Sequence, residues 1–323
     1  LPGTRVTENT KYVSNGKTAW IPKGFTVSGI KSEQSIDDGL VIYDIPEGTT
    51  VDWTNPDSVK TAYNQFVWIP VEVKSTDTEN SIASFYRSEW TANASTGGDR
   101  TAGLSTNYTE PDSTNDTADK TGIAGQITEL TKSIYKYGGF YIGRYEAGST
   151  TERTDSSSQT EPFVVQQDKY PYNYVTWEKS MSDVSEGAVY LCNNLYTPTN
   201  TNYGATSMLC TGASWDSMLD FIKDSSHRVT NSTTWGNYFN SETYKVYRGS
   251  SQFSSNSAWS LADTTAGTKV TENKIILLTT GATERNCSKN IYDVAGNVYE
   301  WTTESFSSSY RVHRGRQLQQ LWF

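Results

Sequence analysis

Acidic and amide side chains gather in one short stretch near the carboxyl-terminal end, residues 290–304, which read NIYDVAGNVYEWTTE. Asp293 and Glu300 lie on either side of an Ala-Gly-Asn sequence that is typical of a tight turn. A turn that carries two carboxylates and free carbonyl groups supplies the hard oxygen ligands that Ca²⁺ accepts. The stretch therefore predicts a candidate structural Ca²⁺ site at Asp293, Gly296, Val298 and Glu300.

A purely structural role is the alternative for the same stretch. Asn297 and Glu300 can tie the turn by hydrogen bonds while Trp301 fills the core. Two carboxylates also leave most of the about six to eight ligands of a calcium ion to the backbone and water. Both interpretations stay open on the sequence alone.

Few residues in the chain suit redox, zinc or nucleophilic chemistry. The 2 His residues, His227 and His313, cannot build a His-rich metal site and hardly supply a Ser-His-Asp triad. The 3 Cys residues fit no CxxC pattern. We expect one disulfide at most, with Cys192 and Cys210 as the pair to test; the alternative is that these two and Cys287 are buried free thiols.

Composition narrows the class of protein and of partner. The chain has 323 residues, enough to bury a core without metals or disulfides. Hydrophobic residues make up 35% and charged residues 20%, so the polarity comes from Ser, Thr, Asn, Gly and Tyr, which favours strands and loops over helices. A net charge of -9 repels phosphate backbones, so we expect no nucleic-acid partner.

Membrane contact is not expected from this segment either. The longest aliphatic run, residues 275–278, is far shorter than the about 20 apolar residues of a membrane span. The sequence opens at Leu1 without an initiator Met or an apolar signal, so we expect a fragment or a processed form whose anchor, where one exists, lies upstream.

Local patterns predict the elements that must position these residues. Short strands and turns are expected over residues 18–71, after a lead-in or linker at 1–17. Residues of about 74–125 are rich in Thr, Ser, Asn, Asp and Gly, which predicts a long surface insertion or a poorly ordered loop. Apolar and aromatic alternation over 135–148 indicates a buried hairpin strand.

Two amphipathic helices are predicted further along the chain. The first covers residues 175–195 and the second covers 211–222, with Thr211 as the N-cap. Residues 227–268 read as irregular structure rich in aromatic and polar side chains. Two helices among many short strands indicate an α+β fold.

The Gly-Asn-x-x-Glu-Trp core of residues 290–304 resembles the signature of the formylglycine-generating-enzyme-like domains, a branch of the C-type lectin fold. Further segments resemble the family in the expected order: FVWIPV at 66–71, GGFYIGRYEAG at 138–148, YPYNYVTWEKSM at 170–181, TGASWDSMLDFI at 211–222 and YRVHRG at 310–315. The resemblance implies one domain over residues 18–323, with two helices around short antiparallel sheets and a large loop content.

The same resemblance implies a binding protein rather than an enzyme. The sulfatase-modifying enzymes of the family use a reactive Cys pair beyond the Arg-Gly motif, and this chain has no Cys after Cys287. The sulfoxide-forming relatives hold iron with several His residues, which 2 His residues cannot supply. The alternatives are a catalytically degenerate relative of these enzymes and a generic surface structural domain.

Within the family, the chain is most similar to the variable proteins of diversity-generating retroelements, which display a hypervariable C-terminal face to a ligand. This similarity implies a truncated variable segment at residues 305–323, a monomer, an unknown protein or glycan ligand, and a place on a bacterial cell surface or phage particle. The expected contacts are Tyr310, Arg311, His313, Arg314, Arg316, Gln317, Gln319, Gln320 and Trp322, with Trp235 and Tyr238 as weaker neighbours. For Arg311 and Arg314, a structural role as salt-bridging residues is the alternative.

Overall fold

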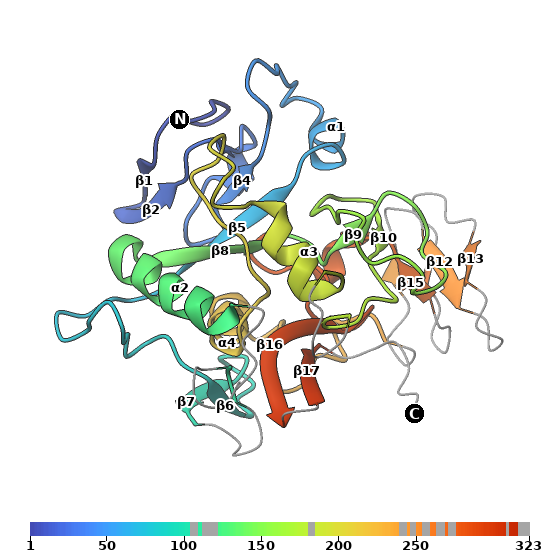
Figure 1. The fold of residues 1–323 in the computed structure, drawn as a ribbon. Coiled ribbons are helices and arrows are strands. Elements are labelled where there is room, and N and C mark those ends of the chain that lie inside the picture. Colours follow the sequence, from blue (N-terminus) through green and yellow to red (C-terminus); the bar gives the residue numbers. More distant parts are fainter. Residues whose placement is uncertain are drawn as a thin grey trace.

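The computed structural model describes residues 1–103, 109–111, 122–179, 185–238, 276–307 and 310–315, together with the backbone of four short strands between residues 244 and 270. These parts form several small antiparallel sheets and a few helices, which confirms the predicted α+β class (Figure 1).

The four-stranded antiparallel sheet at the centre of the molecule divides the core in two. It consists of β3 (Thr26–Val27), β4 (Val41–Tyr43), β5 (Gln65–Pro70) and β8 (Gly139–Gly143), in that order. Successive side chains of a strand point to opposite faces. Val67 and Ile69 accordingly join one hydrophobic cluster, whereas Phe66 and Trp68 join the other.

The remaining described elements are short. The other strands are β1 (Thr10–Ser14), β2 (Lys17–Ile21), β6 (Ser88–Thr91), β7 (Asp99–Ala102), β9 (Gly148–Ser149), β10 (Tyr170–Pro171), β11 (Tyr244–Lys245), β12 (Ser250–Phe253), β13 (Trp259–Ala262), β14 (Lys269–Val270), β15 (Ile276–Leu278), β16 (Glu300–Ser307) and β17 (Tyr310–Arg314). The helices are α1 (Pro56–Lys60), α2 (Ile123–Tyr137), α3 (Ala188–Leu195) and α4 (Gly212–Ile222), with 3-10 turns at Lys31–Glu33 and Glu284–Asn286.

Helix α4 confirms the prediction for residues 211–222. The Thr211 hydroxyl accepts a hydrogen bond from the backbone N–H of Ser214 at 3.0 Å and so caps the first turn. Trp215, Met218 and Ile222 are buried in the main core, as their helical spacing indicates.

The prediction of two helices was wrong in number and in one boundary. Helix α2 was missed because the polar composition before it obscured the 4-3-4 spacing of Ile123, Ile127, Leu130 and Ile134, which is typical of a helix. Helix α3 starts only after Gly187, and residues 175–179 are not helical; residues 180–184 lie outside the described part.

Two segments expected to lie apart from the core pack against it. Within the predicted insertion, β6 and β7 form a hairpin, and Arg100 joins it to α4 through Asp220 at 3.4 Å. Residues 1–17, expected as a lead-in or linker, contain β1, which pairs with β2, and Val6, which is buried in the second cluster.

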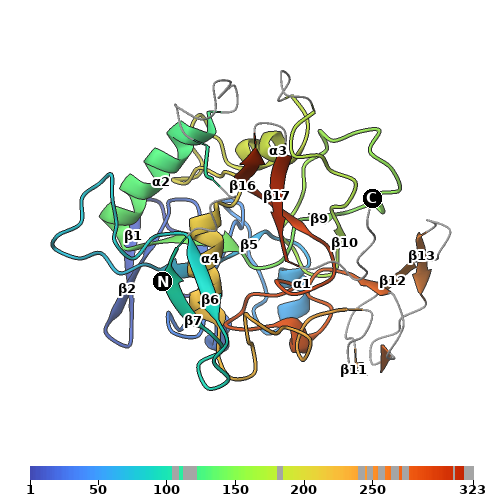
Figure 2. The ribbon, with the colours of Figure 1, turned by 90° about the horizontal axis from the view of Figure 1, so that it is seen from below.

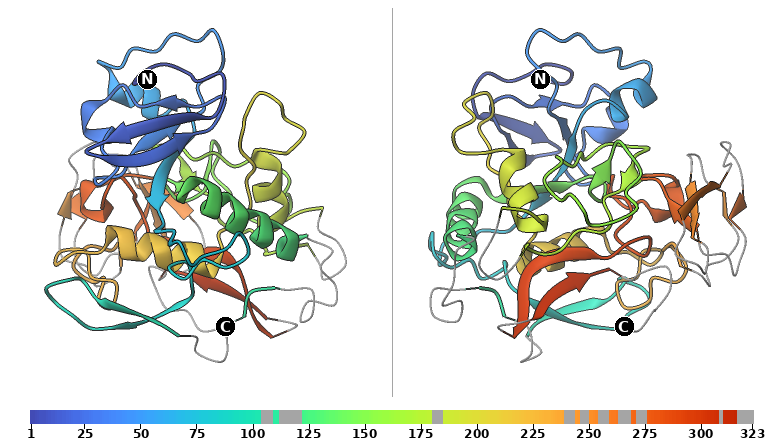
Figure 3. Two further views of the ribbon diagram at one scale, coloured as in Figure 1. Left: turned by 90° about the vertical axis from the view of Figure 1, so that its left-hand side faces the viewer. Right: turned by 45° about the vertical axis from the view of Figure 1, so that its right-hand side comes forward.

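The β16–β17 hairpin lies at the end of the molecule opposite the N-terminal strands β1 and β2 (Figure 3). Strand β16 lies beside α3 (Figure 2), where Trp301 packs against a cluster that contains Ala188 and Val189. The last part of the family-like motif, in β16, therefore lies at one end of the fold, whereas Ile291 and Val294 of its first part belong to the main hydrophobic cluster.

Candidate functional site

The β16–β17 hairpin carries the described part of the predicted binding segment. Glu300 pairs with Arg314 and Trp301 with His313, and two register shifts follow before Ser307 pairs with Tyr310. Such irregularities bend a strand and redirect its side chains. The hairpin therefore presents some side chains to solvent and turns others inward.

Arg314 belongs to a buried ion network and not to an open contact surface. Its Nη2 atom lies 2.6 Å from Oε2 of Glu304, and its Nε atom lies 2.8 Å from the same oxygen. Arg87 also pairs with Glu304, and with Asp216 of α4. The structural alternative for Arg314 is therefore confirmed: the residue joins β17 to β16, while Arg87 joins the insertion to both β16 and α4.

Glu110 lies beside this network. Its carboxylate accepts hydrogen bonds from the backbone N–H of Gly212 at 2.5 Å and from the Thr303 hydroxyl. Burial is the main cause that raises the pKa of Glu110 to about 7, and repulsion from the nearby Glu304 carboxylate adds to it. The segment 109–111 also bridges to Ser305 in β16, so the insertion contacts the hairpin from its outer edge.

Arg311 stacks on an aromatic ring. Its guanidinium carbon lies 4.1 Å from the centroid of the Trp177 ring. The Trp177 indole is held in turn by a 2.7 Å hydrogen bond from Nε1 to the carbonyl oxygen of Thr302. Arg311 is half-buried, so it retains accessible donors while the stacking fixes its orientation.

Exposed aromatic side chains gather on the same hairpin. Tyr310 is 68% exposed, Phe306 53% and Tyr299, just before β16, 36%. Tyr299 stacks on the exposed His313 ring with a centroid separation of 4.1 Å and an interplanar angle of 24°. Partial burial lowers the pKa of His313, so the imidazole is neutral at pH 7. We call Tyr299, Phe306, Tyr310, Arg311 and His313 the hairpin surface.

The prediction for the two weaker neighbours was wrong. Trp235 and Tyr238 are 4% and 5% exposed and belong to the main hydrophobic cluster. Trp235 Nε1 donates to the carbonyl oxygen of Arg228 at 3.1 Å, and the Tyr238 hydroxyl contacts that of Ser232. Polar partners for the indole and the phenol allow both to be core residues.

Five of the predicted contacts are not part of the described structure. Arg316, Gln317, Gln319, Gln320 and Trp322 follow Gly315, the last residue described. Of the predicted contacts, Tyr310, Arg311 and His313 belong to the hairpin surface, whereas Tyr299 and Phe306 were not predicted.

At the predicted calcium turn, Asn297 has a clear structural role. Its amide Nδ2 donates to Glu146 Oε1 and to the Leu278 carbonyl oxygen, and its Oδ1 accepts from the backbone N–H of Leu278 at 2.9 Å. Asn237 Nδ2 donates to the same Oδ1 at 3.1 Å. These hydrogen bonds give Asn297 the tying role of the structural alternative, whereas Oε2 of Glu300 has no hydrogen-bond partner and Trp301 is only half-buried, so the calcium prediction stays open.

Three carboxyl groups are buried around this turn: Glu146, which the sequence did not indicate, Asp293 and Glu300. Burial raises the pKa of all three, that of Asp293 to about 7, and repulsion from Asp293 raises the pKa of Glu146 and Glu300 further. Oε2 of Glu146 and Oε2 of Glu300 have no hydrogen-bond partner in the described structure. Unsatisfied buried oxygens are the kind of donor that a hard cation accepts.

The carboxyl groups do not complete a metal site by themselves. Among the described residues, no three His, Cys, Asp or Glu side chains converge closely enough to hold a metal ion. A Ca²⁺ ion at Asp293 and Glu300 would need the carbonyl groups of Gly296 and Val298 and water as further ligands. The donor type fits calcium, and the site stays a prediction.

We expect Ca²⁺ to stabilise the protein at this turn. If a millimolar Ca²⁺ excess occupies the site with the affinity of an extracellular module, the free energy of unfolding rises by about 1–3 kcal/mol. Thermal melting in Ca²⁺, in Mg²⁺ and in a chelator measures the effect, and Glu300→Gln is expected to remove it. Asp52→Asn, at an exposed carboxylate, is the control that keeps it. Equal melting temperatures in Ca²⁺ and chelator would refute the site.

The cysteines are free thiols. Cys192, Cys210 and Cys287 form no disulfide, so the pair that we singled out is not linked. Burial raises the pKa of Cys192 and of Cys287 to about 12 and that of Cys210 above its usual range. The free-thiol alternative is therefore confirmed, although the three residues are half-buried and not fully buried. Neutral thiols are poor nucleophiles.

Comparison of the chain with protein-family models, with curated proteins and with solved structures finds no match. In the described part of the chain, no helix has the length and apolar character that a membrane span requires.

Proposed function

We propose that this protein is a non-catalytic ligand-binding protein of the formylglycine-generating-enzyme-like branch of the C-type lectin fold. The protein lies on a cell surface or a phage particle. There it presents the hairpin surface, followed by residues 316–323, to a protein or glycan ligand. A retroelement diversifies this segment.

The concentration of exposed aromatic rings on one hairpin carries the proposal. Three of the seven large hydrophobic side chains exposed among the described residues are Tyr299, Phe306 and Tyr310. Exposed aromatic clusters mark binding sites, because rigid rings supply contact area at a low cost in conformational entropy. Arg311 adds a half-buried guanidinium, the side-chain type that joins aromatic rings in binding hot spots.

A rigid support beneath these side chains also favours a binding role. The buried pair of Glu304 and Arg314 fixes the two strands to each other, and the Trp177 ring holds Arg311. Exposed side chains on such a scaffold can vary without a change in packing, which is the property that a diversified segment needs.

A peptide selection tests whether the hairpin surface binds ligands. Random peptides displayed on phage are selected against the immobilised wild-type protein. We expect the selected peptides to bind Tyr310→Ala at least about tenfold more weakly, because a central aromatic contact contributes more than about 1.4 kcal/mol to binding. Tyr135→Ala, which removes an exposed tyrosine from α2, is the matched control and should bind like the wild type. Peptides that bind both variants equally would place the binding surface elsewhere.

The sequence of the gene locus tests whether a retroelement diversifies this segment. A reverse transcriptase and a near-identical template repeat of the segment that encodes residues 305–323 are expected beside the gene. A locus that lacks both would leave a ligand-binding domain without diversification.

A further inference from the structure

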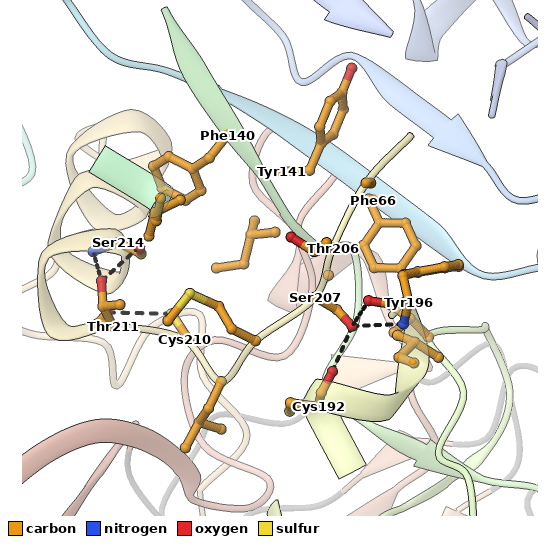
Figure 4. Close-up of a pocket in the computed structure, with 18 of the residues that line it drawn as sticks. Phe66, Phe140, Tyr141, Cys192, Tyr196, Thr206, Ser207, Cys210, Thr211 and Ser214 are labelled. Carbon is orange, nitrogen blue, oxygen red and sulfur yellow. Dashed lines mark hydrogen bonds between the residues drawn. The ribbon is translucent and has the colours of Figure 1, made fainter. Parts of the chain in front are cut away.

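A cavity of about 1110 Å³ lies at the β8 edge of the central sheet, among β8, α2, α3 and the segment 203–211, and side chains from both faces of the sheet line it. Figure 4 shows side chains of β5 and β8, among them Phe66, Phe140 and Tyr141, on one side, and the segment that carries Thr206, Ser207 and Cys210 on another. The cavity has about the size of the largest usual small-molecule sites, which span about 300–1,000 Å³.

Apolar groups form most of the cavity wall. The rings of Phe66 and Phe140 and the side chains of Leu130 and Leu195 line it. The thiol of Cys192, which burial keeps neutral, adds a further weakly polar surface. Such a wall accepts hydrocarbon and aromatic groups.

The acidic side chains of the wall, and the lack of a cationic one among the described lining residues, disfavour an anion. The described residues that line the cavity include Glu129, Glu146 and Glu300, and no Lys, Arg or His among them could neutralise a negative ligand. An acid or a phosphate would therefore lose its hydration without a compensating charge.

Four buried polar atoms of the lining residues have no hydrogen-bond partner in the described structure: Nε1 of Trp68, Oε1 of Gln126, and Oε2 of Glu146 and of Glu300. Gln126 Oε1 is the amide acceptor among them. Gln126 Oε1, on α2, is buried and accepts no hydrogen bond in the described structure, while the Nε2 atom of the same amide donates to Asn193 Oδ1 at 2.9 Å and so sets its orientation. The Ser207 hydroxyl is already engaged, since it donates to the Cys192 carbonyl oxygen at 2.6 Å and accepts from the Tyr196 N–H at 2.8 Å (Figure 4). Gln126 Oε1 therefore remains as an acceptor for a ligand.

We propose that this cavity binds an uncharged, mainly apolar small molecule that donates one hydrogen bond to Gln126 Oε1. The ligand is of the kind of a long-chain alcohol or an aromatic amine. Of the hairpin surface, Tyr299 alone also lines this cavity, and the proposal requires no particular function of that surface.

The uncharged probe N-phenyl-1-naphthylamine, which carries one N–H donor, tests the proposal by its fluorescence in the presence of the full chain. We expect saturable binding at one site, displacement by 1-decanol, and no displacement by decanoate at the same concentration. Decanoate that competes as well as decanol would overturn the uncharged class, and the absence of saturable binding would overturn the site.

Two variants locate the probe. Thr206→Trp places an indole at an exposed position of the cavity wall and is expected to weaken binding by about tenfold or more, because it fills the space. Gln126→Leu removes the acceptor and is expected to weaken binding about fivefold, the usual effect of one neutral hydrogen bond.

Two controls separate this site from other surfaces. Thr128→Trp, at an exposed position of α2 outside the cavity wall, should leave binding unchanged. Tyr310→Ala should leave it unchanged as well, so the result does not depend on the function of the hairpin. Wild-type affinity in Thr206→Trp, or loss of binding in Tyr310→Ala, would contradict the cavity as the site.

Discussion

Glu304→Ala is expected to lower the free energy of unfolding by about 3 kcal/mol, because it removes the fully buried shared partner of two half-buried arginines, whose side chains are 10% and 21% exposed. The Glu304 side chain is fully buried and pairs with both Arg87 and Arg314. Without it, Arg87 keeps its ion pair with Asp216, and Arg314 loses the ion pair that joins β17 to β16. Chemical denaturation at pH 7 measures the loss, which is a large part of the about 5–15 kcal/mol typical of a folded protein.

A matched carboxylate on the surface provides the control. Glu129 pairs with Lys132 at 2.8 Å on α2, but its side chain is 72% exposed. Glu129→Ala is therefore expected to change stability by less than about 1 kcal/mol. Glu304→Gln, which keeps the shape of the side chain, should fall between the wild type and Glu304→Ala. Similar losses in Glu304→Ala and Glu129→Ala would show that the network does not stabilise the fold.

Gly296→Ala is expected to be the second most damaging substitution. Gly296 has φ +85°, a backbone conformation that costs an L-residue about 1–2 kcal/mol. An added Cβ would also overlap the backbone of Asn237, which forms a parallel bridge with Gly296, and such overpacking costs about 1–3 kcal/mol more. The hydrogen bonds of Asn297 next to it would be displaced as well.

Gly16→Ala separates the cost of the left-handed backbone from the cost of the overlap with Asn237. The φ of +75° at Gly16 is similar, but a Cβ there would meet nothing within 4 Å. Gly16→Ala should therefore cost only the about 1–2 kcal/mol of the left-handed backbone. The difference between the two variants in chemical denaturation measures the effect of the Gly296 contact with Asn237, and an equal loss in both would contradict it.

The sequence-based predictions were most accurate for elements whose sequence pattern lies entirely within the element. Strand β5 and helix α4 were predicted because alternation, helical spacing and the Thr211 cap lie within each element. Helix α2 has an equally local pattern in its apolar spacing. It was not predicted because the polar composition of the region before it obscured that spacing. The start of α3 was marked by Gly187, whose φ of +99° does not belong inside a helix.

The candidate site was less predictable because one residue type can serve two roles. Trp235 and Tyr238 looked like surface aromatics but fill the core, whereas Tyr310 is exposed as expected. The sequence offered no sign that Glu146 approaches Asp293, since 146 residues lie between them in the chain. Burial and pairing of this kind depend on contacts that no local pattern encodes.

By itself, the sequence determined the α+β class, the capped helix α4 and the turn around Gly296. Tertiary structure alone decided that Arg314 pairs with Glu304, that Arg87 joins them across 217 residues, and that apolar walls from distant segments enclose a cavity. The physical reason is that backbone preferences act between near neighbours in the chain, whereas burial and charge pairing depend on which distant surfaces meet.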